Sequence, residues 1–204
     1  MASPLDSRLA DLLARRPELA GCAAALRATF DTLVTAFTSG HRLYLCGNGG
    51  STADAEHIAG ELLKGFAHRR PLPIPTDADP LLQKLQGGLP AIPLTGFPAL
   101  RTAVANDMAG ELEYAQLVSA LGEAGDCLLG ITCSGNARNV ALAFETARIK
   151  KMTTILLTGA SGGRAAPLAD HVIRVPAEEI YQIQELHLPI YHTLCLALED
   201  HFFA

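Results

Sequence analysis

The sequence predicts an α/β fold in which a parallel β-sheet carries helices on both faces. Short apolar runs alternate along the chain with segments whose apolar residues recur at helical spacing, which is the pattern of such sheets. Three of the apolar runs end in loops of small polar residues, at the sheet edge where ligands of open parallel sheets bind. The chain has 204 residues, 49% hydrophobic and 18% charged. This is enough for a full core, and we expect one domain over residues 1–204.

The predicted elements follow one another in a regular order. Helical spacing extends from Leu5 to about Ser39, and Pro17 is expected to separate two helices in this N-terminal segment, residues 1–40. Strands are predicted over Arg42–Cys46, Pro90–Thr95, Cys127–Thr132, Thr153–Leu157 and His171–Val175. Helices are predicted over Ser51–Phe66, Ala99–Asp107, Tyr114–Leu121, Ala137–Lys150 and Ile183–Phe203.

One stretch, Arg69–Pro90, interrupts this order. It holds five prolines and the pair Gly87–Gly88, so it cannot be one regular element, although Leu81–Leu85 could form a helical turn. Long loops in compact domains are usually functional or mobile. We expect this proline-rich insertion, residues 69–90, to cover the site or to pad a subunit interface.

Charge and composition argue against several classes of function. The formal net charge is −5, and the basic pairs Arg15–Arg16 and Arg69–Arg70 are interpreted as solvated surface, which disfavours nucleic-acid binding. The cysteines form no CxxC pair and no disulfide framework, and Cys46 and Cys127 lie in apolar runs typical of buried thiols. Neither a signal peptide nor a membrane-spanning run is recognised, so we expect a cytoplasmic protein that does not contact membranes.

The first loop, GNGGS at Gly47–Ser51, has the composition of a phosphate-binding turn. Its glycines, including Gly49 and Gly50, let the backbone approach an anion closely, and Ser51 can cap the following helix. The helix N-terminus then offers free N–H groups and a favourable dipole. An ordinary tight turn is the alternative interpretation.

The second loop, Thr132–Asn136, repeats this arrangement before the next predicted helix. Thr132, Cys133 and Ser134 place two hydroxyls and a thiol at the turn. Neither loop is a Walker loop or a GxGxxG turn, so a phosphorylated ligand smaller than a nucleotide fits better. The third loop, Gly159–Gly163, is left unassigned.

Two helices carry residues suited to acid–base chemistry. His57 and Glu61 lie four residues apart, on one helix face, and Gln184 and His192 share a side of the last helix, with His187 as a rival. An imidazole and a carboxylate near a phosphate loop can act as general acid and base. Histidine, glutamate and glutamine side chains can also bind a divalent metal such as zinc. The alternatives are a surface helix pair at His57–Glu61 and a core histidine at His192.

Four segments together resemble the sugar isomerase (SIS) family, and more closely the bacterial phosphoheptose isomerases: CGNGGSTADAEHIAGEL, AVANDM, GDCLLGITCSGN and YQIQELHLPIYH. The resemblance covers nearly the whole chain. It implies a SIS fold with a flavodoxin-like five-stranded parallel sheet and N-terminal helices. It also implies a homotetramer with sites between subunits. The implied reaction converts sedoheptulose 7-phosphate to D-glycero-D-manno-heptose 7-phosphate.

The same resemblance assigns roles to individual residues. By motif, Glu61 and His192 match the family's catalytic pair. One zinc ion per subunit is implied, at the positions of His57, Glu61, Gln184 and His192. Contacts to substrate and phosphate are implied for Asn48, Gly49, Gly50, Ser51, Asp107, Thr132, Cys133, Ser134 and Gln184.

Some positions depart from the family pattern. The second loop usually reads STSGNS, whereas here Cys133 replaces a threonine and Ala137 a serine, so two phosphate-binding hydroxyls are missing. Tyr181 stands where an aspartate often precedes the glutamine, and Pro189 could kink the last helix. These changes bear on the exact substrate more than on the reaction type.

A second function remains open at this stage. Some SIS modules are not catalytic and bind a sugar phosphate or a protein partner such as a replication initiator. Retention of Glu61 and His192 argues against such a module, and the lack of a helix-turn-helix extension argues against a transcription regulator.

Overall fold

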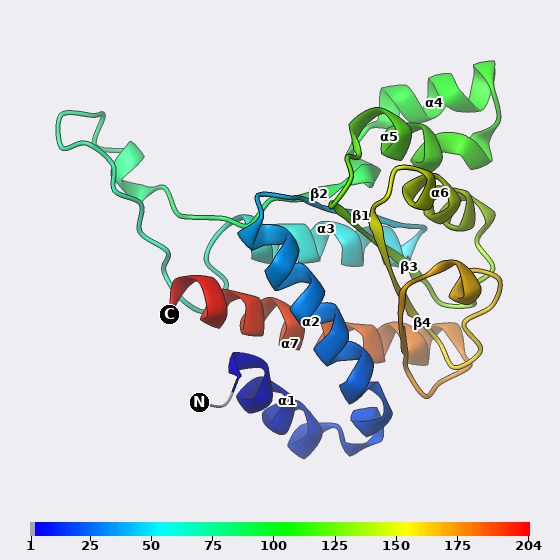
Figure 1. Cartoon of the computed structure of the whole chain (residues 1–204), viewed down its shortest axis with the longest axis horizontal. Coiled ribbons are helices and arrows are strands. Elements are labelled where there is room, and N and C mark those ends of the chain that lie inside the picture. Colours follow the sequence, from blue (N-terminus) through cyan, green and yellow to red (C-terminus); the bar gives the residue numbers. More distant parts are fainter. Residues whose placement is uncertain (1–2) are drawn as a thin grey trace.

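The computed structural model describes residues 3–204 and has a central parallel sheet, as the sequence predicts (Figure 1). The strands are β1 (Leu43–Gly47), β2 (Ala91–Pro93), β3 (Cys127–Thr132), β4 (Thr153–Thr158) and β5 (His171–Arg174). Their order is β2-β1-β3-β4-β5, and every neighbouring pair is parallel. The chain therefore runs outward from β1 to β2 and returns to β3 on the other side of β1, which makes the β1–β3 boundary the topological switch point.

Helices fill the connections between the strands. They are α1 (Pro4–Arg15), α2 (Ala23–Thr38), α3 (Gly50–Leu63), α4 (Pro98–Asp107), α5 (Glu113–Leu121), α6 (Arg138–Ile149) and α7 (Ile180–Phe203). Pro17 separates the first two helices as predicted, because it opens a short 3₁₀ helix, Pro17–Cys22, between them. The last helix begins at Ile180, a turn earlier than predicted, and runs through Pro189 without interruption.

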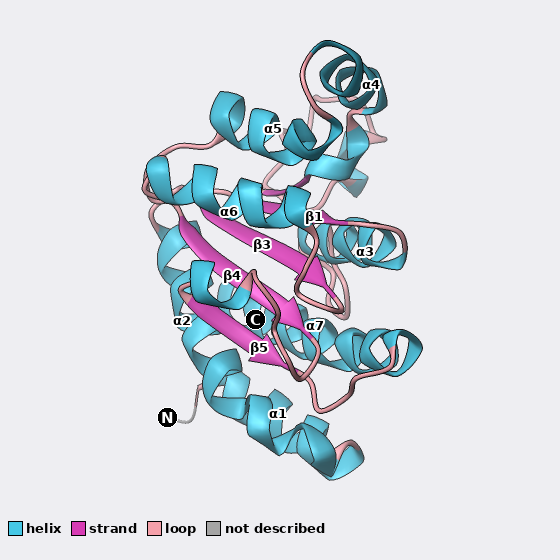
Figure 2. Ribbon diagram, turned by 90° about the vertical axis from the view of Figure 1, so that its right-hand side faces the viewer, coloured by secondary structure: helices cyan, strands magenta, loops and turns pink. Residues whose placement is uncertain are grey.

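Alternation along the strands divides the core between the two faces of the sheet (Figure 2). Leu43 and Leu45 of β1 point into the cluster formed with α1, α2, α3 and α7. Tyr44 and Cys46 point to the opposite face and pack with α5 and α6. Each of these four side chains is at most 2% exposed. The central strands β1, β3 and β4 are thus buried on both faces, which explains their continuous apolar runs.

Cys46 and Cys127 are buried, as predicted, and all five cysteines are free thiols. Burial raises the pKa of both thiols to about 12. Within residues 3–204, none of the helices combines the length and the apolar character that crossing a membrane requires.

The proline-rich insertion forms an arm, defined here as residues 71–86, that projects from the body of the molecule (Figure 1). An antiparallel bridge between Pro71 and Gln86 closes its base, and a 3₁₀ turn at Leu82–Lys84 gives the predicted helical turn. Several leucines of the arm are exposed: Leu72 by 42%, Leu81 by 68%, Leu82 by 44% and Leu85 by 51%.

Candidate active site

The loops that follow β1 and β3 meet at the switch point and line a cavity of about 340 Å³. The lining residues are Asn48, Gly49, Gly50, Ser51, Ile131, Thr132, Cys133, Ser134, Ala137, Ile180 and Gln184. Helices α3 and α6 begin at these loops, so their N-termini direct N–H groups and positive dipole ends to this edge of the sheet. The arrangement suits a small anion such as a phosphate group.

Glycine matters at two positions of the first loop, for different reasons. Gly49 has a φ of +57°, a left-handed conformation that L side chains rarely adopt. A Cβ atom on Gly50 would lie 2.7 Å from Nε2 of Gln184, so a larger residue there would displace the end of the Gln184 side chain from its place at the cavity. The turn at Gly49 also starts the helix early, and the prediction that Ser51 caps it is wrong. The N-cap is Gly49, and Ser51 is buried inside the first turn, 2% exposed.

The third loop, which the sequence left unassigned, supports the second. The N–H of Gly159 donates to the carbonyl of Cys133 at 3.0 Å, and the N–H of Ala165 donates to the carbonyl of Gly135 at 2.9 Å. Within the second loop, the hydroxyl of Ser134 accepts from the N–H of Asn136 at 3.2 Å. Hydrogen bonds from the third loop therefore fix the conformation of the second loop, which lines the cavity.

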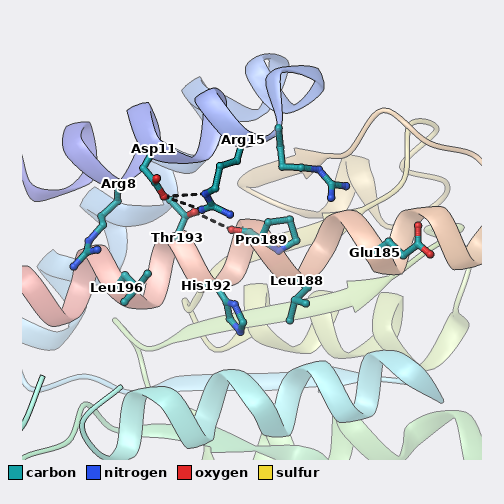
Figure 3. Close-up of a pocket in the computed structure, with 10 residues that line it drawn as sticks. Arg8, Asp11, Arg15, Glu185, Leu188, Pro189, His192, Thr193 and Leu196 are labelled. Carbon is teal, nitrogen blue, oxygen red and sulfur yellow. Dashed lines mark hydrogen bonds and ion pairs between the residues drawn. The ribbon is translucent and has the colours of Figure 1, made fainter. Parts of the chain in front are cut away.

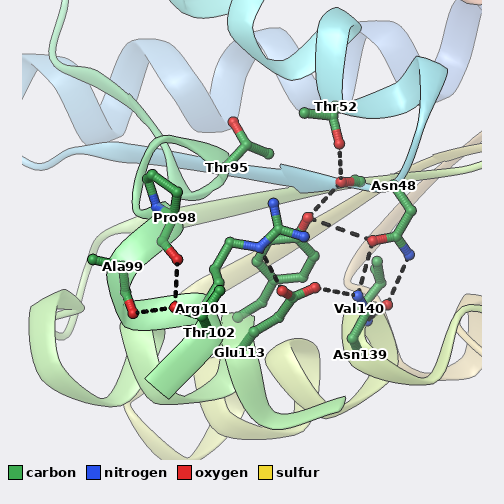
Figure 4. Close-up of polar contacts among 12 residues, drawn as sticks. Asn48, Thr52, Thr95, Pro98, Ala99, Arg101, Thr102, Glu113, Asn139 and Val140 are labelled. Carbon is green, nitrogen blue, oxygen red and sulfur yellow. Dashed lines mark hydrogen bonds and ion pairs between the residues drawn. The ribbon is translucent and has the colours of Figure 1, made fainter. Parts of the chain in front are cut away.

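A polar network orients Asn48 (Figure 4). The amides of Asn48 and Asn139 exchange two hydrogen bonds, of 2.9 and 2.8 Å. Asn139 also donates to Oε1 of Glu113 at 2.8 Å, and Oε2 of the same carboxylate accepts from Nε of Arg101. Sequence reasoning missed Asn139, Glu113 and Arg101, because no motif signals contacts between α4, α5, α6 and the first loop.

The side chain of His192 crosses from α7 to meet the pair on α3. Nε2 of His57 lies 3.0 Å from Oε1 of Glu61 and 3.4 Å from Nε2 of His192. Figure 3 shows His192 pointing away from α1 and towards α3, beside a cavity of about 300 Å³ between α1 and α7. The His57 side chain is 41% exposed and the Glu61 side chain 16%. The structure thus brings together three of the residues that the sequence singled out for chemistry.

Behind this cluster lies a contact that sequence reasoning missed. The hydroxyl of Tyr191 lies 3.0 Å from Nδ1 of His57 and donates to Oδ1 of Asp54 at 3.2 Å. Burial raises the pKa of the Asp54 carboxyl, while Tyr191 and His57 act in the opposite direction. The only signal in the sequence is the spacing of Asp54 and His57, three residues apart on one helix.

Burial also affects His192 itself. It lowers the pKa of the ring, His57 lowers it further, and Glu61 acts in the opposite direction. At neutral pH, the imidazole of His192 is therefore neutral and able to accept a proton.

The donor atoms of this cluster suit zinc by their chemistry, since His57 and His192 offer nitrogens and Glu61 offers an oxygen. Within residues 3–204, however, no group of three or more His, Cys, Asp and Glu side chains is arranged to hold a metal ion. His57 instead contacts both Glu61 and His192 directly, and Gln184 lies eight residues before His192, at the phosphate-like cavity.

Two further residues lie outside the site. Asp107 ends α4, is exposed, and accepts from the amide of Asn106 at 2.7 Å, and it does not line the cavity. The rival histidine His187 is fully buried, and neither ring nitrogen has a hydrogen-bond partner.

Comparison with known proteins identifies the family of this chain. A family model described as SIS domain matches residues 102–198, and another with the same description matches residues 12–79. A Helicobacter pylori protein named phosphoheptose isomerase is 36% identical over 194 residues, which cover 95% of this chain and 93% of the relative. The chain belongs to the phosphoheptose isomerase family of SIS-domain proteins.

Other members of the phosphoheptose isomerase family agree. A Maridesulfovibrio salexigens phosphoheptose isomerase is 40% identical over 163 residues, which cover 80% of this chain and 71% of the relative. The solved phosphoheptose isomerase of Francisella tularensis superposes with a TM-score of 0.76 at 32% identity and covers 98% of this chain and 100% of its own. That of Neisseria gonorrhoeae gives 0.77 at 29% identity, with 96% of each chain covered. The predicted SIS fold is confirmed.

Proposed function

We propose that this protein is an aldose–ketose isomerase that interconverts sedoheptulose 7-phosphate and D-glycero-D-manno-heptose 7-phosphate. The observation that carries the proposal is the approach of His192 to the His57–Glu61 pair, beside loops suited to a phosphate. The family names of the relatives point to the same substrate class.

In the proposed reaction, the phosphate binds at the loops after β1 and β3. The N–H groups at the start of α3 and α6 hold it there, and Asn48 and Gln184 orient the sugar. Glu61 and His192 act as the acid–base pair of a cis-enediol mechanism. One of them takes the proton from C1 or C2 and returns it to the other carbon, and the other transfers the protons of the two oxygens. The lowered pKa of His192 supports its role, because a neutral ring accepts a proton at neutral pH.

We further propose that His57, Glu61, Gln184 and His192 bind one zinc ion per subunit. The nitrogen donors of His57 and His192 and the carboxylate of Glu61 support this, because Nε2 of His57 lies 3.0 Å from Oε1 of Glu61 and 3.4 Å from Nε2 of His192. When bound, zinc would polarise the substrate carbonyl as a Lewis acid.

We also propose that the protein is a cytoplasmic homo-oligomer, a tetramer as the family resemblance implies. The exposed leucines of the arm support subunit contacts. So does the 41% exposure of His57, since one chain leaves the reactive cluster open to solvent.

The test of the proposed function is an isomerase assay on sedoheptulose 7-phosphate, with pentose and hexose phosphates as comparison substrates and metal analysis of the same sample. Turnover of the heptose phosphate above the others is expected. Binding without turnover of any sugar phosphate would instead indicate a non-catalytic module.

The acid–base assignment predicts that Glu61→Gln and His192→Asn each abolish turnover, because each removes a group that transfers protons. The fold and the affinity for phosphate should remain, since neither side chain lines the phosphate-like cavity. Circular dichroism and sugar-phosphate binding by calorimetry check the second half of the statement. Full activity in either variant would end the assignment.

A further inference from the structure

We propose that Glu113 and Asn139 are positioning residues that make Asn48 present an N–H group, and not its carbonyl oxygen, to a ligand in the cavity. The inference rests on the proposed function only in taking this cavity as the place where a sugar phosphate binds. It concerns the contacts that lead from the carboxylate of Glu113 through the amide of Asn139 to the amide of Asn48, which we call the amide row (Figure 4).

The amide row begins at an ion pair. Nε of Arg101 donates to Oε2 of Glu113 at 2.5 Å, and the Glu113 side chain is 11% exposed. The hydrogen bond to Glu113 raises the pKa of the Arg101 guanidinium, so the arginine stays charged. A carboxyl group beside this charge is ionised at neutral pH, and its oxygens only accept hydrogen bonds. The other oxygen, Oε1, accepts from Nδ2 of Asn139 at 2.8 Å.

Two neighbours hold the amide of Asn139 in one orientation. Its Nδ2 faces the carboxylate of Glu113, and its Oδ1 accepts from the backbone N–H of Val140 at 3.0 Å. Turning the amide over would set its oxygen against the carboxylate and its NH₂ group against the backbone N–H. Both contacts would then join like groups, so only one orientation satisfies them.

The orientation of Asn139 passes to Asn48. Asn139 donates to Oδ1 of Asn48 at 2.8 Å and accepts from Nδ2 of Asn48 at 2.9 Å, so the two amides pair head to tail. The hydroxyl of Tyr114 agrees with this orientation, since it lies 3.4 Å from the same Oδ1 while it donates to the carbonyl of Gly47 at 2.5 Å. Nδ2 of Asn48 has two N–H groups, and Asn139 uses one of them. Within residues 3–204, the other has no hydrogen-bond partner.

The remaining N–H group gives the cavity wall a defined polarity. Asn48 lines the cavity at the loop before α3, opposite the loop before α6. An N–H group there suits a ligand oxygen that only accepts, either a phosphate oxygen or the carbonyl oxygen of an open-chain sugar. With the amide turned over, Oδ1 of Asn48 would face that oxygen and repel it. The amide row thus selects an accepting oxygen at this point.

A double-mutant cycle tests the amide row. Asn48→Ala removes the N–H group. Glu113→Gln leaves one oxygen to serve both Arg101 and Asn139, so the orientation of the row is no longer fixed. A third variant combines the two changes. Equilibrium dialysis measures the affinity of each full-length protein for inorganic phosphate and for sedoheptulose 7-phosphate, and it requires no turnover.

Loss of one hydrogen bond to a charged or strongly polar oxygen corresponds to about ten-fold in affinity. We expect about this loss in Asn48→Ala and a loss of about three- to ten-fold in Glu113→Gln. The double variant should lose no more than Asn48→Ala, because Glu113 acts only through Asn48. A loss for both ligands assigns the contact to the phosphate, and a loss for the sugar phosphate alone assigns it to the carbonyl oxygen.

The sign of the effect separates the amide row from a general effect of charge. Removal of a negative charge near the cavity should by itself strengthen anion binding, whereas loss of the row weakens it. Glu111→Gln is the matched control, because Glu111 pairs with Arg138 instead, at 3.4 Å, with side chains 51% and 72% exposed. Its affinities should equal or slightly exceed those of the wild type. Wild-type affinity for both ligands in Glu113→Gln, or a further loss when this change is added to Asn48→Ala, would overturn the inference.

A spectrum of the side-chain amides provides a second readout. The chain has four asparagines, so labelling with ¹⁵N-asparagine gives four pairs of side-chain amide protons, and the pair of Asn48 is identified by its loss in Asn48→Ala. We expect one proton of this pair to shift when ligand binds to the wild type or to Glu111→Gln, and to shift less in Glu113→Gln. Asn48 protons that respond to neither ligand in the wild type would overturn the inference. If they respond but no sugar phosphate is isomerised, the proposed function fails and the amide row stands.

Discussion

His187 and His192 lie five positions apart on α7 and meet opposite surroundings. His192 turns towards α3 and contacts His57, whereas His187 is fully buried and its ring nitrogens have no hydrogen-bond partner. Burial lowers the pKa of His187 to about 4, and only the backbone of Thr158 acts in the opposite direction. One histidine is therefore available for proton transfer, while the other affects stability.

His187 is expected to make folding sensitive to acid. Above pH 6.5, the ring is neutral in both the folded and the unfolded chain. As the pH falls from about 6.5 to about 4, the unfolded chain binds a proton that the folded chain does not, so stability is lost across this window. The full effect is about 3 kcal/mol, from about 1.4 kcal/mol per pKa unit.

The measurement is the free energy of unfolding by urea at several pH values between 7 and 4.5, for the wild type and His187→Leu. Leucine is apolar and cannot titrate, so the variant should lose less stability on acidification. Parallel pH profiles for the two proteins would contradict this explanation.

At the scale of elements, a buried ion pair joins the end of α3 to α7. Nε of Arg70 lies 2.9 Å from Oε1 of Glu199, and both side chains have no exposed surface. Arg70 also donates to the carbonyls of Leu62 and Glu61, at 2.8 and 3.1 Å, which are among the last of the helix and lack partners within it. The ion pair thus fixes the turn of α3 that carries Glu61.

The buried carboxylate of Glu199 accepts hydrogen bonds from several donors. Burial alone would raise the pKa of its carboxyl, but the N–H groups of Phe66 and Ala67 and the guanidinium of Arg70 more than offset it, so the pKa lies below its usual range. The guanidinium also lies over the ring of Phe203, 4.5 Å from its centroid. Removing the arginine alone leaves this carboxylate buried without its counter-charge.

Arg70→Met is therefore expected to destabilise the fold by about 3–5 kcal/mol. The matched control is Arg8→Met, because Arg8 pairs with Asp200, the next residue of α7, at 2.7 Å, with side chains 30% and 19% exposed. A partly exposed pair of this kind contributes only about 1 kcal/mol or less. Urea unfolding at pH 7 measures both variants, and equal losses would show that burial of the pair is not decisive.

The elements were largely predictable, because periodicity reports burial directly. The strand over Cys127–Thr132 was predicted with its correct bounds, since all of its side chains are buried between two helical layers. The start of α3 was predicted less well. The sequence suggested Ser51 as the capping residue, but Gly49, with its positive φ, is the N-cap, and the helix begins before Ser51. The contacts of Arg70 and Tyr191 join positions more than 120 residues apart, and no local pattern encodes them.

For the whole molecule, the position of the binding site at the edge of the sheet was predictable from the sequence, because the two glycine-containing loops follow predicted strands. Spacing placed His57 beside Glu61, but only the fold shows that α7 brings His192 to the same point. Family resemblance implied this meeting and the place of Asp107 near the sugar. In a single chain, Asp107 lies at the exposed end of α4 and away from the cavity lining.

The arm bears on the proposed oligomer rather than on the single chain. Replacing residues 72–85 with a short Gly-Ser linker should leave the fold intact, since the arm projects from the body and its leucines are exposed. We expect the proposed oligomer of this variant to dissociate at a higher protein concentration than that of the wild type, or KM to rise. Sedimentation velocity over a range of concentrations and a substrate titration measure these effects. If neither the mass nor KM changes, the arm is surface decoration.

Helix α7 carries residues of three features, and the helix fixes their angular positions relative to one another. These are Gln184 at the cavity, Tyr191 and His192 at the reactive cluster, and Glu199 at the buried ion pair. Each residue added to or removed from a helix turns everything beyond it by about 100°. A single-codon insertion or deletion between positions 184 and 199 would therefore separate these features from their partners. The arm meets no such constraint, because lengthening a loop costs little. Among descendants of this gene, chain length should thus drift within residues 71–86 and stay constant along α7.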